Sequence, residues 1–169
     1  MDGARAPVLL KTARQYDFIL TSAWTNKTAK PIDDMAQAIA KVWAPIARLK
    51  VPIVAIRDNP SPGGVPEANP NNCLANVGVA EANQKCGLSR EKAIDRFTDP
   101  YGIAVKQTPR SHLVDLTRWY CDNSTCPVVI GGVNVYRDNS NVTTNYARTM
   151  APSSDRALIR AGARTDRRA

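Results

Sequence analysis

The sequence predicts an α/β domain, a three-layer α/β/α sandwich with a mostly parallel sheet. Three short segments, Tyr16–Trp24, Val51–Ile56 and Ser111–Thr117, contain apolar runs that are typical of buried strands. Segments with helical features separate them, and such alternation of strands and helices is the usual order in this class. Because sites in these sheets gather beyond the carboxyl ends of the strands, the loops that follow the strands are the first candidates.

The first half of the chain is expected to hold two strands and one helix. Tyr16–Trp24 is a strand that runs into a loop. Pro31 can occupy the first turn of the helix, which Pro45 is expected to kink or shorten near its end. The strand Val51–Ile56 then leads into a loop rich in proline, glycine and asparagine, "RDNPSPGGVPEANPNN". Apolar residues recur at helical spacing in the helix, at Met35, Ile39, Val42, Trp43 and Ile46.

The second half begins with two helical segments. Ser89 is expected to cap the helix "REKAIDRF", which Asp99-Pro100 interrupts. A further helical stretch covers Tyr101–Gln107, and Ser111–Thr117 is the third strand. The segment "PVVIGGVNVYRD" contains the Gly131-Gly132 break and a short extended piece after it.

The C-terminal region is expected to be a helix followed by a tail. The helix starts near Val142, and its first part ends at Pro152. The last fifteen residues hold five Arg and two Asp, a balance of +3 that leaves +5 of the net charge of +8 to the rest of the chain. No internal repeat is present, so we assign residues 1–152 to one domain and residues 153–169 to a basic, flexible tail.

Composition excludes several classes of protein. A chain of 169 residues with 43% hydrophobic residues fits one globular domain. No apolar run approaches the roughly 20 residues of a membrane span, and the start has only a short apolar piece at Pro7–Leu10, a poor signal peptide. The sequence shows no helix-turn-helix, zinc-ligand or aromatic RNA-binding pattern. We therefore expect no metal, no cofactor and no nucleic-acid partner.

The four cysteines form two local pairs. Cys73 and Cys86 flank "LANVGVAEANQK", and Cys121 and Cys126 flank "DNST". Neither pair has the C-x-x-C spacing of zinc or redox sites, and the only histidine, His112, lies outside both. We favour two disulfide-closed loops over four free buried thiols. Disulfides would indicate an oxidising compartment.

Taken together, several stretches resemble one family. "YDFILTSAW", "VPIVAIRDNP", the first cysteine pair, "HLVDLTRWYCDNSTCPVVIGGVNVYRD" and "NVTTNYARTMAP" stand in the order found in the SGNH-type domain of bacterial acyltransferase-3 proteins. The resemblance covers roughly Ala13 to Ala151, is most specific from Val114 to Pro152, and has an actinobacterial style. It implies an SGNH-hydrolase or flavodoxin-like sandwich with paired cysteines at both places.

The resemblance also implies a Ser-His-Asp mechanism, which this chain departs from. Such a site needs a serine on a Gly-Asp-Ser turn and an Asp-x-x-His pair, in which the His takes the serine proton and the Asp orients the His. Asp138 matches that Asp, but Asn141 stands at the His position and cannot act as a general base. No Gly-Asp-Ser occurs, so we expect the nucleophile strand to be missing.

Other residues are assigned by their place after a strand. Ser22 matches a family block that supports the oxyanion site and substrate pocket, and it is not the nucleophile. Trp24, Arg57 and Asp58 are further pocket candidates, although a core tryptophan or a surface ion pair would explain them equally well. His112 is expected to be structural rather than a replacement base.

Three functions follow from these observations. The first is the SGNH domain, or a piece of one, of an envelope-glycan O-acyltransferase that is inactive here. The second is a non-catalytic module that binds a glycan or an acyl donor, and the third is a basic nucleic-acid binder. For the first, the resemblance implies as partners an envelope glycan, an acyl donor and a membrane acyltransferase domain encoded upstream. It also implies a location on the extracytoplasmic face of the membrane.

Overall fold

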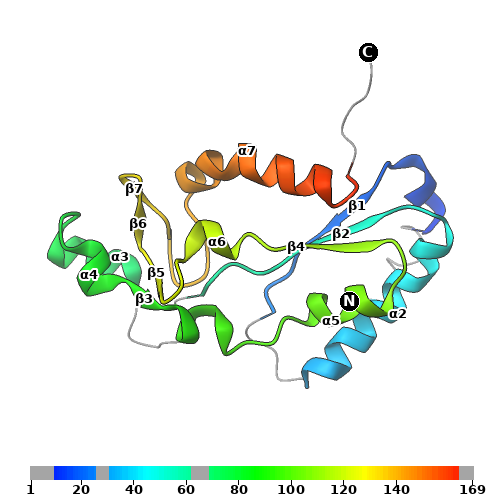
Figure 1. The fold of residues 1–169 in the computed structure, drawn as a ribbon, viewed down its shortest axis with the longest axis horizontal. Helices are drawn as coiled ribbons and strands as arrows, with labels where there is room; N and C mark the ends of the chain where they lie inside the picture. The colour runs from blue at the N-terminus through cyan, green and yellow to red at the C-terminus, as the bar shows by residue number, and fades with distance from the viewer. Residues whose placement is uncertain (1–9, 26–30, 62–68, 164–169) are drawn as a thin grey trace, which may run out of the picture. The chain divides into compact units, whose positions relative to one another are not determined.

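The computed structural model describes residues 10–25, 31–61 and 69–163, and it divides the chain into two compact units. The first unit comprises Met1–Asp58, Asp99–Asp115 and Asp155–Ala169. The second comprises Asn59–Thr98 and Leu116–Ser154. Figure 1 labels the elements of both units. Each unit combines segments that are far apart in the sequence, so each is described separately below.

The first unit contains the predicted parallel sheet. Its strands are β1 (Ile19–Thr21), β2 (Ile53–Ile56) and β4 (Ser111–Val114), in the order β1-β2-β4 with parallel neighbours throughout. The first three residues of the central strand β2 are buried, as expected for a parallel strand that is covered on both faces. The predicted fold class is therefore confirmed, although β1 and β4 are shorter than the segments that predicted them.

Two helices cover one face of this sheet. Trp43 of α2 (Ile32–Arg48) stacks on Tyr101 of α5 (Pro100–Gln107), with ring centroids 5.6 Å apart. Both side chains are buried in one apolar cluster with Ile53 of β2. This cluster is the core of the first unit, and it fixes α2 and α5 against the strands.

The ends of these helices differ in part from the prediction. α2 begins directly after Pro31 and continues through Pro45 to Arg48, so the proline does not end the helix where it stands. α5 begins at Pro100, where the missing N–H of proline is harmless. Asp99 caps it, since its Oδ1 accepts a hydrogen bond from the backbone N–H of Tyr101 at 2.9 Å. A short 3-10 turn, η1 (Ala13–Gln15), precedes β1.

The C-terminal part of the first unit lies on the opposite face of the sheet. Successive strand residues point to opposite faces, so Val54 and its neighbour in register, His112, point away from the face that Ile53 presents to α2 and α5. A Cβ atom built on Gly162 would lie 3.8 Å from Nε2 of His112. The end of α7 (Thr144–Arg160) therefore gives the sheet a helical layer on its second face.

α7 is longer than the sequence predicted. It runs through Pro152 to Arg160, and Gly162, with a φ of 87°, ends it as a glycine C-cap. The N–H of Ala163 donates to the carbonyl of Leu158 at 3.0 Å. The expectation of a flexible tail from residue 153 is therefore wrong for residues 153–160, which are helical. Residues 164–169 of that tail lie outside the described residues.

The second unit contains only short strands. β3 (Leu88–Ser89) pairs antiparallel with β5 (Thr125–Cys126), and β6 (Val129–Ile130) pairs antiparallel with β7 (Val133–Asn134). Gly131 and Gly132, both with positive φ, form the turn between β6 and β7, in agreement with the predicted glycine break. The sequence did not predict the three short helices of this unit, α3 (Pro70–Val77), α4 (Ala82–Cys86) and α6 (Thr117–Tyr120).

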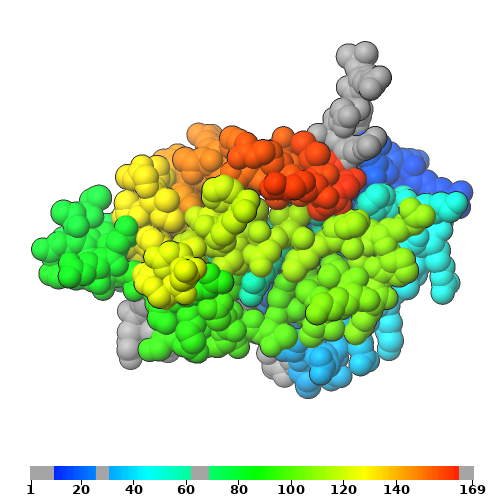
Figure 2. Space-filling model, in the orientation of Figure 1, coloured from blue at the N-terminus to red at the C-terminus, as the bar shows by residue number. Residues whose placement is uncertain are grey.

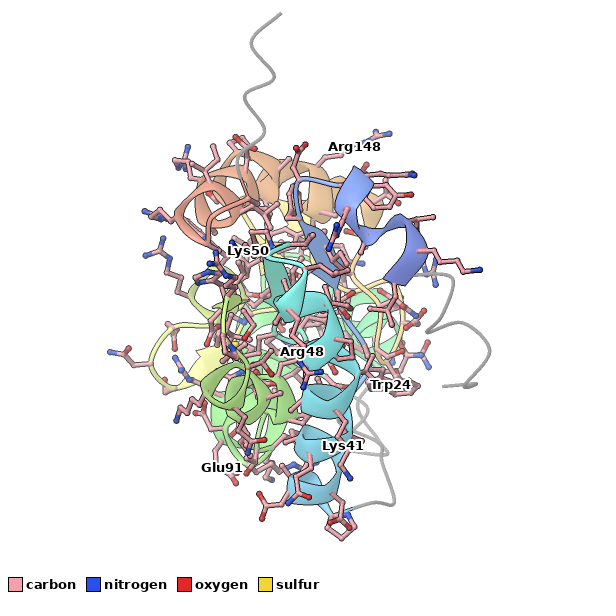
Figure 3. All side chains as sticks on the ribbon, turned by 90° about the vertical axis from the view of Figure 1, so that its right-hand side faces the viewer. Trp24, Lys41, Arg48, Lys50, Glu91 and Arg148 are labelled. Carbon is pink, nitrogen blue, oxygen red and sulfur yellow. A yellow bond between two sulfur atoms is a disulfide. The ribbon has the colours of Figure 1, made fainter. Side chains whose placement is uncertain are left out.

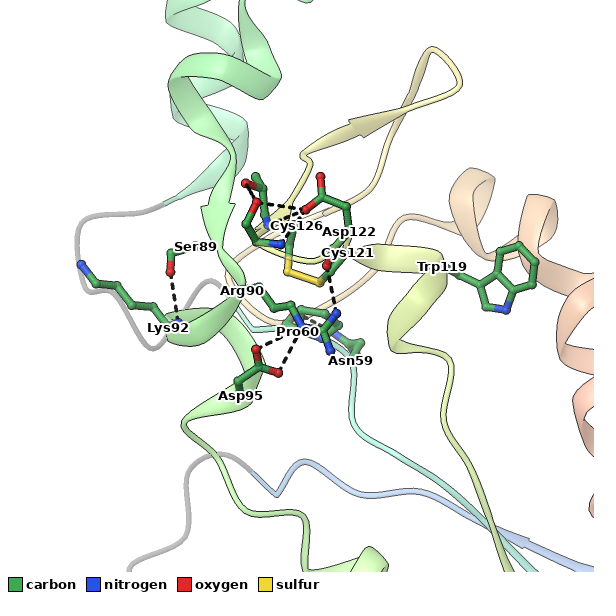
Figure 4. Close-up of a disulfide and its surroundings, with 12 residues drawn as sticks. Asn59, Pro60, Ser89, Arg90, Lys92, Asp95, Trp119, Cys121, Asp122 and Cys126 are labelled. Atoms are coloured by element: carbon green, nitrogen blue, oxygen red, sulfur yellow. Dashed lines mark hydrogen bonds and ion pairs between the residues drawn. A yellow bond between two sulfur atoms is a disulfide. The ribbon is translucent and has the colours of Figure 1, made fainter.

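The helix predicted after Ser89 forms only as a π-helical turn, η3 (Glu91–Asp95). Its N-cap residue is Arg90, which makes no side-chain capping bond. The hydroxyl of Ser89 accepts a long hydrogen bond of 3.5 Å from the N–H of Lys92 (Figure 4). The predicted Ser89 cap is therefore wrong in position, because Ser89 belongs to β3 and the backbone N–H of Arg90 bonds to Ser124 at 2.8 Å.

Both predicted disulfides are present, and both lie in the second unit. Cys73 of α3 is bonded to Cys86 at the end of α4, and Cys121 is bonded to Cys126 of β5 (Figure 4). No cysteine of the chain is free. The alternative of four free thiols is therefore wrong, and the bonds fit an oxidising compartment.

Candidate functional site

The carboxyl edge of the parallel sheet carries the polar residues that follow its strands. Arg57 follows β2, and its Nη1 lies 2.8 Å from Oδ2 of Asp115, which follows β4. The backbone N–H of Arg57 also donates to the carbonyl of Val114 at 2.9 Å. The arginine side chain is 21% exposed, so this ion pair is partly shielded from water. It orients Arg57 along the edge rather than into solvent.

Asp58 connects the same edge to the segment after β1. Its Oδ2 accepts a hydrogen bond from the backbone N–H of Thr25 at 2.9 Å and lies 3.5 Å from the Thr25 hydroxyl. Thr25 is buried. Asp58 therefore acts as a fixed acceptor that holds the loop after β1 in place.

Two residues at the start of α5 extend this group. The hydroxyl of Tyr101 lies 3.3 Å from the hydroxyl of Thr21, the last residue of β1. Burial raises the pKa of the Asp99 carboxyl, although a hydrogen bond from the Tyr101 backbone and the nearby Arg57 guanidinium lower it. Within the described residues, Oδ2 of Asp99 is buried without a hydrogen-bond partner. We name Thr25, Arg57, Asp58, Asp99 and Asp115 the sheet-edge cluster.

The other candidates from the first unit are less engaged. Ser22 is exposed and makes no hydrogen bond with the described residues. Trp24 is 49% exposed and lies at the surface (Figure 3), so it is not a core residue, in contrast to the buried Trp43. His112 is exposed within β4, two residues before the carboxyl end of that strand. It therefore does not belong to the loops that form the sheet edge.

In the second unit, Asp138 is surrounded by donors. Its Oδ1 accepts hydrogen bonds from the backbone N–H groups of Ser140 and Asn141, at 2.9 and 2.8 Å. The Nδ2 group of Asn141 lies 3.0 Å from Oδ1 and 2.9 Å from Oδ2, and Nη2 of Arg137 lies 3.3 Å from Oδ2. The hydrogen bond from the Asn141 side chain and that from the Ser140 backbone hold the pKa of Asp138 well below its usual range. We name residues Arg137–Asn141 the Asp138 turn.

A network of side chains ties this turn to the rest of the second unit. The Nδ2 group of Asn59 donates to the carbonyl of Ser140 at 3.2 Å, and the hydroxyl of Ser61 donates to the carbonyl of Asn139 at 3.3 Å. Both donors lie in the loop after β2. The turn is therefore held by the segment that the sequence marked as a loop rich in proline and asparagine.

A second part of the network comes from α3. The side-chain amide of Asn71 donates to the carbonyl of Arg137, and its Oδ1 accepts a hydrogen bond from Nδ2 of Asn134 at 2.9 Å. The N–H of Arg137 in turn donates to the carbonyl of Asn141 at 2.8 Å. These contacts fix the backbone of the turn at both ends, so the Asp138 carboxylate has a defined orientation.

Sequence reasoning identified only part of these groups. Arg57 with Asp58, and Asp138 with Asn141, were named as candidates, and each pair lies within one unit of the structure. The convergence of both pairs on one cleft stays a prediction, as do their catalytic or binding roles. Asp115 was missed, although its place directly after a strand was a usable signal. Asp99 was read only as the end of a helix, and nothing in its neighbours indicated its burial.

The structure also bears on metals and membranes. No group of three or more His, Cys, Asp or Glu side chains within residues 10–25, 31–61 and 69–163 is placed to hold a metal ion. Among the helices in those same ranges, none is long and apolar enough to cross a membrane.

Comparison with known proteins identifies a family. The family model described as "SGNH domain (fused to AT3 domains)" matches residues 7–155. No curated protein and no solved structure matches the chain.

Proposed function

Because the chain belongs to the family of SGNH domains that are fused to acyltransferase-3 domains, we propose that it is part of an envelope-glycan O-acyltransferase and lacks a general base of its own. Membership in the family gives the chain an acyltransferase-associated role with a membrane acyltransferase domain as partner. The acyl group would pass to a carbohydrate hydroxyl, and the two disulfides support work on the extracytoplasmic side.

One observation carries the second half of this proposal. The amide nitrogen of Asn141 lies within 3.0 Å of both carboxylate oxygens of Asp138. An imidazole at residue 141 would donate its N–H to the same carboxylate and offer its second nitrogen to the serine. An amide nitrogen donates but has no lone pair to accept a proton. The pair therefore has the orienting half of the catalytic arrangement without the base.

Asp138 does not replace the missing base. When a serine hydroxyl attacks an acyl carbonyl, its proton must pass to a neighbouring group as the new ester bond forms. Asp138 is already saturated with hydrogen bonds from Ser140 and Asn141, and its lowered pKa makes it a weak proton acceptor. The proton of an attacking serine would have no acceptor in the Asp138 turn.

The test is hydrolysis of an activated acetyl ester by the purified, disulfide-bonded chain. We expect no turnover above the rate without protein. Asn141→His alone is also expected to stay inactive, because the 169 residues contain no Gly-Asp-Ser sequence to supply the serine. Activity is expected only when Asn141→His is combined with an N-terminal segment that carries this serine. Turnover by the unchanged chain that disappears in Asp138→Ala would refute the proposal.

A pocket in the second unit favours a second candidate function, a module that binds a glycan without modifying it. The pocket has a volume of about 530 Å³ and is lined by aromatic and charged side chains, including Trp119, Tyr146 and Arg118. Ligand sites commonly combine such apolar walls with a few polar groups. Binding of neutral oligosaccharides by the isolated chain would support this function, and it needs no general base.

A further inference from the structure

The pocket of the second unit lies among four segments. α6, the loop closed by Cys121–Cys126, the β6–β7 hairpin and α7 all contribute to its wall, and α6, the hairpin and α7 adjoin on the face shown in Figure 2. The hydroxyl of Tyr146 donates to the carbonyl of Trp119, which joins α7 to α6 at the pocket. Its apolar lining consists of Trp119, Pro127, Ile130, Val133, Tyr146 and Met150.

The charged groups of this pocket are only partly engaged. The guanidinium of Arg118 lies over the Trp119 ring, 4.8 Å from its centroid, and has no carboxylate partner among the described residues. Oδ1 of Asp122 accepts the backbone N–H groups of the two residues that follow Asn123, at 2.8 and 2.7 Å. Within the described part of the chain, Oδ2 accepts no hydrogen bond, and the dashed lines of Figure 4 end on one carboxylate oxygen only.

We propose that this pocket binds a sugar ring of a neutral glycan. The apolar face of a pyranose would lie on the Trp119 ring, and its hydroxyls would bond to the Arg118 guanidinium and to Oδ2 of Asp122. Indole rings present an apolar face beside a polar N–H, which suits such a ligand.

Three other ligand classes fit less well. An anion would be repelled by Asp122, and a cation would be repelled by Arg118. An acyl chain would cover both charged groups without offering them hydrogen bonds, which costs free energy. Only a neutral ligand with several hydroxyl groups satisfies the charges of both signs and the apolar wall together.

The inference rests on the second candidate function, and it does not need acyl transfer. The experiment uses the intact, disulfide-bonded chain and saturation-transfer NMR with neutral tetrasaccharides of N-acetylglucosamine, mannose and galactose. Octanoate serves as the acyl-chain comparison. We expect at least one tetrasaccharide to bind and octanoate not to bind.

The variants locate the site. Trp119→Ala is expected to weaken sugar binding by roughly tenfold, as truncation of a central aromatic residue does at other interfaces. Arg118→Met keeps the ring and removes the charge, and it is expected to cause a smaller loss. Arg96→Met is the matched control, because Arg96 lies 4.6 Å from the centroid of Phe97 in the same unit and does not line the pocket. This control is expected to bind as the unchanged chain does.

Each outcome decides between the site and the function. Sugar binding that survives both Trp119→Ala and Arg118→Met would overturn the site but retain the glycan-binding function. The site is likewise overturned, and the function retained, if Arg96→Met causes as large a loss as Arg118→Met. If none of the three tetrasaccharides binds, or if octanoate binds instead, the site and the second candidate function are both overturned. Thermal unfolding of each variant shows that the fold is retained.

Discussion

The two units of this chain are stabilised in different ways. The first unit has a parallel sheet covered by helices, with Trp43 stacked on Tyr101 in a buried cluster. The second unit has only two-residue strands, and it holds both disulfides of the chain. Burial of large apolar side chains therefore dominates in one unit, whereas covalent bonds and side-chain hydrogen bonds take over much of that role in the other.

The same contrast applies to one aspartate in each unit. Asp99 of the first unit has a buried oxygen without a partner in the described residues, and burial raises its pKa. Asp138 of the second unit accepts hydrogen bonds at both oxygens, and these lower its pKa. Identical side chains thus favour opposite protonation states because one is desolvated and the other is saturated with donors.

The largest expected effect is in the core of the first unit. Trp43→Ala removes a ring that is 6% exposed and leaves a cavity against Tyr101, at a cost of about 3–5 kcal/mol. Urea unfolding at neutral pH measures this loss. Trp24→Ala is the control, since its ring is 49% exposed and its removal leaves no comparable cavity. Equal losses in the two variants would contradict the importance of this core.

Removal of the disulfides comes next. Loop-closure entropy predicts a loss of roughly 3 kcal/mol for Cys73→Ser with Cys86→Ser, and roughly 2 kcal/mol for Cys121→Ser with Cys126→Ser. The first pair costs more because it closes the longer loop, with a sequence separation of 13 against 5. Hydrogen exchange is expected to rise in α3 and β3 while β2 stays protected. Equal deprotection of β2 would show that the units do not unfold separately.

These differences also explain how much of the fold the sequence could predict. β2 and α2 were predicted because a run of Val and Ile residues and a helical repeat of apolar residues are strong signals. α3 was missed because its core-facing pattern is weak, although Asn69 followed by Pro70 is a capping signal that was available. α7 was cut short at Pro152 because a proline normally ends a helix, and tertiary packing overrode that tendency.

The candidate site was predictable only where a residue's role follows from its place in the chain. Asp138 and Asn141 are three residues apart in one turn, so their contact follows from local geometry. The bond from Asn71 to the carbonyl of Arg137 joins segments 66 residues apart, and no local pattern encodes it. The partial burial of Asp99 likewise depends on the packing of α5 against the sheet, which the sequence does not show.

The comparison of the two aspartates gives a smaller effect that tests charge alone. Asp138→Asn replaces an acceptor by an amide group, which brings a second donor against Nδ2 of Asn141. We expect a loss of about 1–2 kcal/mol at neutral pH. Because the pKa of Asp138 is lowered in the folded state, its contribution is present above the unfolded value of roughly 3.9 and lost as pH falls further. The difference from the unchanged chain should therefore shrink in acid.

Asp95→Asn serves as its control. Asp95 lies in the same unit and pairs with Arg90 at 3.0 Å, and its side chain is 44% exposed. An exposed ion pair of this kind contributes little, so the control is expected to lose less than about 1 kcal/mol. A loss as large as that of Asp138→Asn would mean that any carboxylate of this unit has the same effect.

The smallest expected effect has the opposite sign. Asp99→Asn keeps an oxygen that can accept the N–H of Tyr101, and it removes a charge that burial disfavours. Because the pKa of Asp99 is raised in the folded state, the charged carboxyl costs stability above that pKa, and the cost disappears as pH falls toward the unfolded value. Asp99→Asn should therefore be as stable as the unchanged chain or slightly more stable at neutral pH, with no gain in acid. Asp99→Ala, which loses the cap, is expected to cost about 1 kcal/mol. Urea unfolding at several pH values would contradict this expectation if Asp99→Asn were destabilised as strongly as Asp138→Asn, because attraction to Arg57 would then outweigh burial.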